Sequence, residues 1–197
     1  MSKYTLVILC GKAGAGKDYL LRKLKDHYGD KLNYIVSDTT RPPRDGEVDG
    51  VDYNFKTFDE WHEKSSHRQY LEMTCYEIAK DEFWFYGTPY SSLVKNKINI
   101  GIFNIDGIKQ LYEKDDLNIK IFYISANDRT RLLRQINREE YPDCAEICRR
   151  FLADEQDFKN LTKYPFTKIR NSSGVSDDQC VDYIIEEINQ LDLVLTE

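Results

Sequence analysis

A glycine-rich segment between a strand pattern and a helix pattern constrains this chain more than any other feature. Residues 11–18 read GKAGAGKD, directly after the apolar run YTLVILC at 4–10 and directly before YLLRKL at 19–24, where a helical pattern begins that ends at Gly29. In such a context, small residues let consecutive backbone N–H groups turn toward phosphate oxygens. The sequence therefore predicts a phosphate-binding loop.

The predicted loop implies a nucleotide and a metal ion. Lys17 is expected to reach the β- and γ-phosphates, beside the positive end of the following helix. The residue after the lysine is usually Ser or Thr; here it is Asp18, whose carboxylate suits a hard cation. We therefore expect ATP and Mg²⁺ as cofactors, with Asp18 as the metal ligand. The residues expected to contact ATP are Gly11, Ala13, Gly14, Ala15, Gly16, Lys17 and Asp18. A glycine turn that binds nothing is the alternative, which the flanking strand and helix disfavour.

Composition narrows the class of protein. The chain has 197 residues, enough for one domain with a sizeable core, and a net charge of −6. This acidic balance argues against nucleic acid or an anionic membrane as the main partner, so small-molecule nucleotides are the expected partners of a monomer or homodimer. No apolar run is long enough to span a membrane, and the first strand begins without a signal-peptide pattern. These features predict a cytoplasmic protein.

The cysteines indicate a reducing environment. There are five of them, an odd number, which fits free thiols better than a disulfide framework. Cys144 and Cys148 lie four residues apart, and we interpret them as buried apolar positions rather than as a metal-binding pair.

Residues 37–55, SDTTRPPRDGEVDGVDYNF, are too rich in proline, glycine and charge for a regular helix or central strand. Arg41 and Arg44 lie three residues apart on a backbone stiffened by two prolines, and paired guanidinium groups suit a phosphate dianion. By itself, this pattern leaves open a solvated turn that carries two arginines.

The segment 37–55 resembles the TTRxPRxGExxGxDYxF signature of the guanylate kinases. The resemblance implies that Arg41, Arg44 and Tyr53 hold the phosphate of GMP, with Ser37 nearby. It extends to YLEM at 70–73 and to WFYGTP at 84–89, and implies guanine recognition by Glu72, Thr88 and Asp106 and a phosphate contact from Tyr86. A glutamate facing N1–H and the exocyclic amine, with a hydroxyl donor facing O6, complements guanine and not adenine.

The remaining pattern predicts alternating strands and helices. We expect strands at 33–37, 98–105, 118–125 and 166–171 and helices at 58–64, 91–97 and 128–138. Residues 74–85 are expected to form a hairpin longer than is usual in the family. A second long helix is expected to present one apolar face, and so is a closing helix. The residues of these two faces are Ile147, Phe151, Leu152, Phe158 and Leu161, and then Val181, Ile184, Ile185, Ile188 and Leu191.

These elements predict an α/β fold, a mainly parallel five-stranded sheet with helices on both faces. The resemblance implies the P-loop nucleoside monophosphate kinase fold as a single domain over 1–197, with an inserted α+β acceptor-binding lobe at 38–90 and a helical lid at 127–150. The core would comprise 1–37, 98–126 and 151–197.

Arginines are concentrated in the expected lid. The resemblance favours Arg134, Arg138 and Arg150 as catalytic cations beside Lys17, with Arg149 an equally good alternative to Arg150, and it places Asn171 near the adenine of ATP. Solvated helix faces with ion pairs are the alternative for these arginines. Asn104 stands where the family has an aspartate.

The resulting prediction is ATP-dependent phosphorylation of GMP, or of dGMP, to the diphosphate. Two other readings stay open. One is a kinase for another phosphorylated acceptor, such as ribose 1,5-bisphosphate or a different nucleoside monophosphate, and the other is a non-catalytic binding module of the guanylate-kinase-like kind. The signature at 37–55 disfavours the first, and Lys17 disfavours the second.

Overall fold

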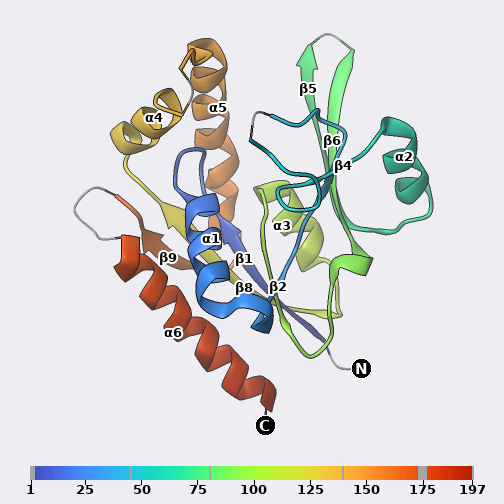
Figure 1. Ribbon diagram of the computed structural model, residues 1–197, viewed down its shortest axis with the longest axis vertical. Helices are drawn as coiled ribbons and strands as arrows, with labels where there is room; N and C mark the ends of the chain where they lie inside the picture. Colours follow the sequence, from blue (N-terminus) through green and yellow to red (C-terminus); the bar gives the residue numbers. More distant parts are fainter. Residues whose placement is uncertain (1–2, 45, 80, 139, 173–176, 197) are drawn as a thin grey trace.

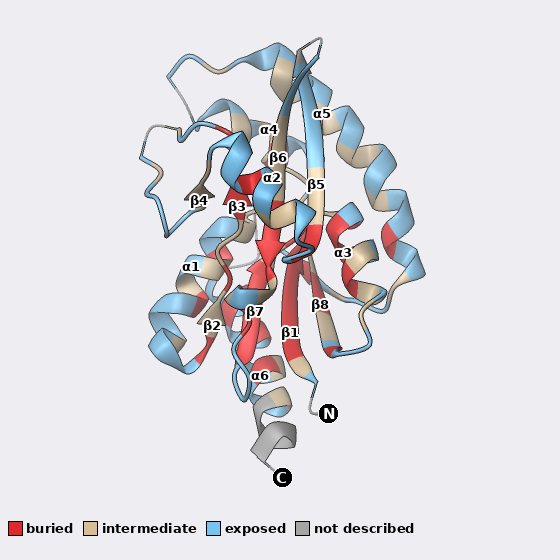
Figure 2. Cartoon of the chain, turned by 90° about the vertical axis from the view of Figure 1, so that its right-hand side faces the viewer, coloured by how far each residue is buried: buried red, intermediate tan, exposed pale blue. Residues whose placement is uncertain are grey.

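In the computed structural model of the chain, the described residues are 3–44, 46–79, 81–138, 140–172 and 177–196. The apolar runs form a five-stranded sheet in the order β2-β7-β1-β8-β9, in which every neighbouring pair is parallel. Its strands are β1 (Tyr4–Cys10), β2 (Asn33–Tyr34), β7 (Ile98–Ile102), β8 (Leu117–Ser125) and β9 (Thr167–Arg170). This confirms the expected sheet, whose central strands are buried on both faces because helices cover each side (Figure 2).

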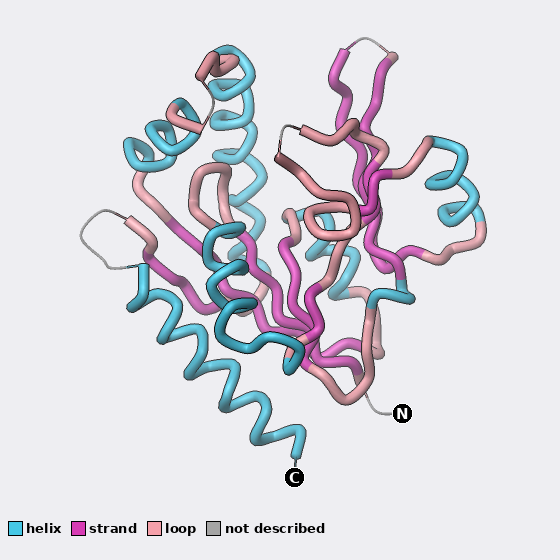
Figure 3. Tube along the Cα trace, viewed as in Figure 1, coloured by secondary structure: helices cyan, strands magenta, loops and turns pink. Residues whose placement is uncertain are grey.

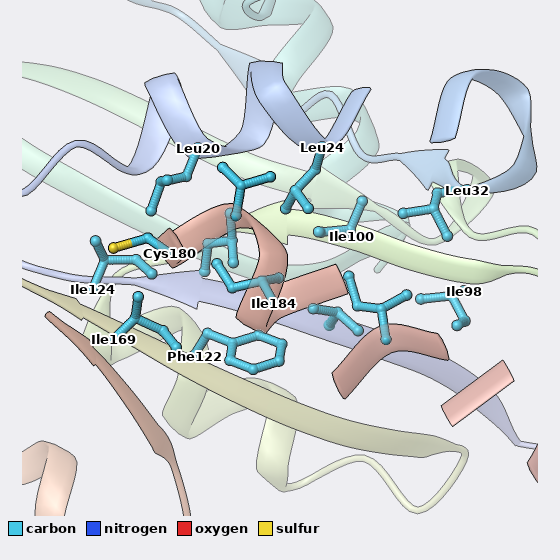
Figure 4. Packing of buried hydrophobic residues seen from close by; sticks show 14 of the residues in the cluster. Leu20, Leu24, Leu32, Ile98, Ile100, Phe122, Ile124, Ile169, Cys180 and Ile184 are labelled. Atoms are coloured by element: carbon cyan, nitrogen blue, oxygen red, sulfur yellow. The ribbon is translucent and has the colours of Figure 1, made fainter. Parts of the chain in front are cut away.

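Two apolar layers sandwich the sheet. One layer lies under α1 (Lys17–Tyr28) and α6 (Asp177–Thr196), where Leu20, Leu24 and Ile184 pack on Ile100 and Phe122 (Figure 4). The other lies under α3 (Ile105–Tyr112) and the 3-10 helix η3 (Phe158–Lys163). The predicted apolar face of the closing helix is confirmed, since all five of its residues belong to or pack against the first layer. Within the described residues, no helix is both long and apolar enough to cross a lipid bilayer.

A second sheet stands beside the carboxyl end of the first (Figure 3). Its order is β4-β3-β6-β5, with β3 parallel to β4 and the other pairs antiparallel. The strands are β3 (Asp38–Thr39), β4 (Asn54–Phe55), β5 (Tyr70–Ala79) and β6 (Glu82–Pro89). The long β5–β6 hairpin confirms the expectation for residues 74–85.

A short helix braces this second sheet. Helix α2 (Phe58–Ser66) begins at a capping box formed by Thr57 and Glu60. Its Trp61 packs on the rings of Tyr70 and Phe85, with centroids 5.6 and 4.7 Å away. The predicted helix at 58–64 is therefore confirmed and extends two residues further.

On the opposite side of the phosphate loop stand α4 (Asp128–Ile136) and α5 (Cys144–Asp157) (Figure 1). Three expectations for this region are wrong. Helix α4 ends before Arg138, and Leu152 is 67% exposed because it lies about 100° around the helix from Phe151. Cys144 and Cys148 are exposed rather than buried, because no apolar layer covers the first turns of α5.

The predicted helix at 91–97 is also wrong. Only the 3-10 helix η2 (Tyr90–Ser92) forms there, and Val94 is exposed rather than inward. The buried side chain of Asn99 explains the difference, because it bonds both the N–H and the C=O of Val94 and the C=O of Lys97. These bonds satisfy backbone groups that a helix would otherwise pair.

Two predicted strands are shorter than expected. β7 ends at Ile102 instead of 105, because the side chain of Asn104 accepts from Gly107 N–H at 2.7 Å and begins helix α3. β2 ends at Tyr34 instead of 37, because the chain leaves the first sheet and enters the second at Asp38. The strands predicted at 118–125 and 166–171 are confirmed within one residue at each end.

Candidate active site

The phosphate loop lies between β1 and α1, as the sequence predicts. Gly14 and Gly16 have φ angles of +76° and +95°, which glycine adopts without strain. A Cβ on Gly11 would lie 2.3 Å from the carbonyl oxygen of Ile124, so this glycine permits close packing on β8. The Lys17 ammonium donates to the carbonyl of Gly11 at 2.7 Å, and burial lowers its pKa.

Side chains from outside the loop hold its carbonyl groups. Arg134 Nη1 donates to Ala15 O at 3.3 Å and to Gly14 O at 3.4 Å, and Asn171 Nδ2 donates to Ala15 O at 2.9 Å. Both residues were expected to contact ATP directly. The structure brings them to the donor site, but their polar groups contact the loop backbone.

The acceptor lobe contains a buried guanidinium group. Arg41 is 3% exposed and forms a two-pronged pair with Glu47, both N···O distances being 2.9 Å. Its guanidinium carbon lies 5.3 Å from the centroid of the Tyr53 ring. Burial favours neutral Glu47, but bonds from Arg41 and from Arg44 N–H outweigh this effect and lower the pKa of Glu47. The lobe thus presents a cation in a fixed orientation.

Electrostatic coupling shows that the acceptor lobe and the expected lid face each other. Burial lowers the pKa of Arg44, and the positive charge of Arg41 lowers it further. Arg150 and Arg138, from the other side of the molecule, also lower the pKa of Arg44. Three guanidinium groups thus act on that of Arg44, a costly arrangement without an anion and a favourable one around phosphates.

The phosphate loop faces the same region. Burial raises the pKa of Tyr53 to about 12, with smaller contributions from Tyr86 and from the negative charge of Asp18. Asp18 is exposed at the start of α1, so its carboxylate is accessible to a ligand. The ends of the donor loop and of the acceptor lobe thus lie within electrostatic reach of each other.

Near the start of α5, one carboxylate holds two arginines. Glu146 accepts from Arg150 Nε at 2.6 Å and from Arg149 Nε at 2.6 Å, and hydrogen bonds from Arg149, then Arg150, lower its pKa to about 2. Arg149 is exposed on the helix surface, whereas the charge of Arg150 acts on Arg44. Of the two, Arg150 is the one directed toward the acceptor lobe.

Three residues expected at the guanine end of the acceptor site form one hydrogen-bonded chain. Glu72, 6% exposed, accepts from the Thr88 hydroxyl at 2.7 Å, and the Ser37 hydroxyl lies 2.8 Å from that of Thr88. Burial raises the pKa of Glu72. A Cβ on Gly107 would lie 3.0 Å from Glu72 Oε2, so the start of α3 approaches the carboxylate closely. Thr88 uses its proton on Glu72, a positioning bond that the sequence did not predict.

Asp106 and Tyr86 complete the predicted set. Asp106 lies exposed in the first turn of α3, directly before Gly107. It takes no part in the hydrogen bonds that join Glu72, Thr88 and Ser37. The ring of Tyr86 lies 5.9 Å from that of Tyr53 and 5.6 Å from that of Tyr76. The Tyr76 hydroxyl in turn accepts from Asn104 Nδ2 at 2.5 Å, which ties the long hairpin to the first sheet.

Sequence reasoning missed four residues of this region. Glu47 was within reach, because it belongs to the signature that carried the resemblance, although no role was assigned to it. Tyr76, Arg131 and Asp154 were assigned no role, because the contacts that bring them to this region join residues at least 23 positions apart in the chain.

A phosphate loop opposite an arginine-bearing lobe, on a parallel α/β sheet, defines a phosphotransferase of the P-loop class. The guanylate kinase family profile matches residues 3–187, so the chain belongs to the guanylate kinase family. The reaction of this family is phosphorylation of GMP by ATP.

Individual relatives agree with this assignment. The guanylate kinase of Campylobacter jejuni is 26% identical over 170 residues, 84% of this chain and 80% of that protein. The guanylate kinase of Clostridium perfringens is 30% identical over 172 residues, 85% of this chain and 76% of that protein. The crystal structure of guanylate kinase from Anaplasma phagocytophilum has a TM-score of 0.64 over 98% of this chain and 88% of that chain, at 17% identity, which shows a shared fold.

Proposed function

We propose that this chain transfers the γ-phosphoryl group of ATP to GMP and releases ADP and GDP. The phosphate loop with Lys17, in a chain of the guanylate kinase family, is the observation that carries this proposal, and the positive charges of Arg41, Arg138 and Arg150 acting on Arg44 support it. Guanidinium groups gathered on one region, with Lys17 and the loop amides on its donor side, suit two phosphate chains that meet end to end.

Acceptor specificity is assigned to the base end of the lobe. The Glu72 carboxylate would accept from guanine N1–H and the exocyclic amine, and Ser37 with Thr88 would supply the hydroxyl donor to O6. When the base enters, the Thr88 proton turns toward O6 or the Ser37 proton takes that role. Arg41, Arg44, Tyr53 and Tyr86 would hold the phosphate, and Asp106 lines the entrance beside the base.

The donor side fits a magnesium nucleotide. The described residues hold no cluster of three carboxylate, histidine or cysteine side chains that would bind a metal without a nucleotide. Mg²⁺ in kinases takes one or two protein carboxylates and completes its shell with phosphates and water, which matches the single exposed carboxylate of Asp18. Bound Mg²⁺ would offset the negative charge of the phosphates.

The residues of the chain contribute position and charge rather than covalent chemistry. An oxygen of the GMP phosphate attacks the γ-phosphorus, that P–O bond forms as the bond to the ADP oxygen breaks, and the nucleophile is already an anion. Lys17, Arg138 and Arg150 would stabilise the transferred group, while Arg134 and Asn171 keep the loop in its binding shape. We assign residues 38–90 to the moving acceptor lobe and 127–150 to the lid, over the core of 1–37, 98–126 and 151–197.

An acceptor screen tests the proposal. Purified protein with ATP and Mg²⁺ is expected to release ADP when GMP is added and to release far less with AMP, CMP, UMP or ribose 1,5-bisphosphate. Equal turnover of AMP would refute the guanine assignment. Absence of turnover with every acceptor, in protein that binds GMP, would instead favour a binding module.

A further inference from the structure

An arginine that the proposed transfer does not use is buried beside the phosphate loop. Arg131 of α4 is 1% exposed and is the largest fully buried side chain of the described residues. Its guanidinium lies 4.3 Å from the Phe151 ring centroid and pairs with three carboxylates. The N···O distances are 3.1 Å to Asp128, 3.1 Å to Asp154 and 3.0 Å to Glu155. A fully buried charge with this many partners is costly to place, so its contacts indicate its role.

Arg131 and Asp154 also bond the backbone of the phosphate loop. The N–H of Ala13 donates to Asp154 Oδ2 at 2.6 Å, and Arg131 Nε donates to the C=O of Ala13 at 3.1 Å. The neighbouring Lys12 pairs with Glu155 at 2.5 Å. Both polar groups of Ala13 are therefore bonded to one ion pair, whose members come from α4 and α5. Figure 1 shows the loop before α1 lying beside α5.

The geometry of the peptide bond gives this grip a consequence for the ligand. In a planar trans peptide, the C=O of one residue and the N–H of the next point in opposite directions. Because Arg131 holds the Ala13 carbonyl toward α4, the Gly14 N–H must point away from α4 and toward the inside of the loop. Gly14 approaches the backbone of α4 closely, since an added Cβ would lie 2.5 Å from Arg131 O.

We propose that Arg131 and Asp154 are positioning residues for the phosphoryl donor, which orient the Ala13–Gly14 peptide so that the Gly14 N–H faces the nucleotide phosphates. The inference rests on the proposed function and names the two side chains that would determine the conformation of the phosphate loop. The same ion pair fastens α4, which carries Arg134, and α5, which carries Arg150, to the loop.

The test measures donor and acceptor binding separately. Calorimetric titration with ADP and Mg²⁺, and in parallel with GMP, is compared for wild type, Asp154→Asn, Asp154→Ala and Arg131→Lys. Asn keeps an oxygen for the Ala13 N–H, whereas Ala removes it, so we expect Kd for ADP to rise a few-fold in Asp154→Asn and about tenfold in Asp154→Ala. Lysine keeps the positive charge but cannot bond Ala13 O and the carboxylates together, so Arg131→Lys should also weaken ADP about tenfold.

Controls separate this role from general stability. Kd for GMP should stay within twofold of wild type in every variant. Lys120→Met breaks the partly buried ion pair between Lys120 of β8 and Glu187 of α6. It should lower Tm without weakening the binding of ADP. Arg131→Lys retains the charge balance and carries the test if Asp154→Ala fails to fold. Unchanged ADP affinity in folded Arg131→Lys, or equal losses for ADP and GMP, would overturn the proposal. Wild type that binds ADP but fails to phosphorylate GMP would refute the proposed function and leave this inference standing.

Discussion

Replacing Glu72 by glutamine tests the base-binding site with the smallest change of shape. The carboxylate is buried and accepts hydrogen bonds from the hydroxyl and from the backbone N–H of Thr88, which still leaves oxygen lone pairs for a base. Guanine offers N1–H and an amine hydrogen, both donors. Glutamine keeps one oxygen acceptor but puts an NH₂ group where the second acceptor was, so one bond is lost and two donors face each other.

The magnitude follows from hydrogen bonds to a charged group. Each contributes about 1.5–3 kcal/mol when buried. Glu72→Gln loses one such bond and makes the second bond a neutral one, which together should weaken the binding of GMP by about 3 kcal/mol. This free energy corresponds to a rise of roughly 100-fold in KM for GMP. The folded state should not suffer, because burial raises the pKa of Glu72 and glutamine removes a carboxylate that burial disfavours.

Coupled detection of ADP release gives KM for GMP and for ATP in the same preparation. Glu77→Gln is the matched control. Glu77 lies on the same strand as Glu72 but is exposed, and its cross-strand neighbour in the hairpin is Phe83. We expect KM for ATP and Tm to stay at wild-type values in both variants. A KM for GMP within twofold of wild type in Glu72→Gln would refute the guanine-binding role of this carboxylate.

Three further predictions use other contacts of the site. Lys17→Ala should lower kcat by about 100-fold or more at unchanged Tm, because it removes a preorganised cation; kcat within tenfold of wild type would contradict this. As pH falls through the raised pKa of Glu72, its carboxylate takes up a proton at a higher pH than an exposed glutamate would. The KM for GMP should therefore rise on the acid side in wild type, and more weakly in Glu72→Gln. Parallel pH profiles of the two proteins would count against this prediction. Glu47→Gln should loosen the buried Arg41 and raise KM for GMP about tenfold with KM for ATP unchanged, and an equal change in both constants would argue for a global effect.

Features written in consecutive residues were predictable. The phosphate loop at 11–18 and the signature at 37–55 depend on glycine, proline and arginine at short spacing, and the structure places both as expected. The parallel sheet followed from near-continuous apolar runs, which only strands covered on both faces require.

Errors arose where a distant or buried partner overrides local preference. Asn99 prevents the helix at 91–97 by bonding the backbone around Val94, which no periodicity reveals. Leu152 was predicted on one apolar face with Phe151, but it lies about 100° around the helix from that residue and is exposed. Arg134 was expected at the triphosphate, a role that stays a prediction, and its contacts with loop carbonyls 119 and 120 positions away were not foreseen because no local pattern indicates them.

Local sequence was sufficient for the kind of loop, the sheet and the family signature, because backbone conformation and apolar burial follow from near neighbours. The tertiary structure alone decided that the charges of Arg138 and Arg150 act on Arg44 and that Arg131 and Asp154 bond Ala13. Such contacts depend on how layers stack, since the free energy of a buried ion pair comes from groups that only the complete fold brings together.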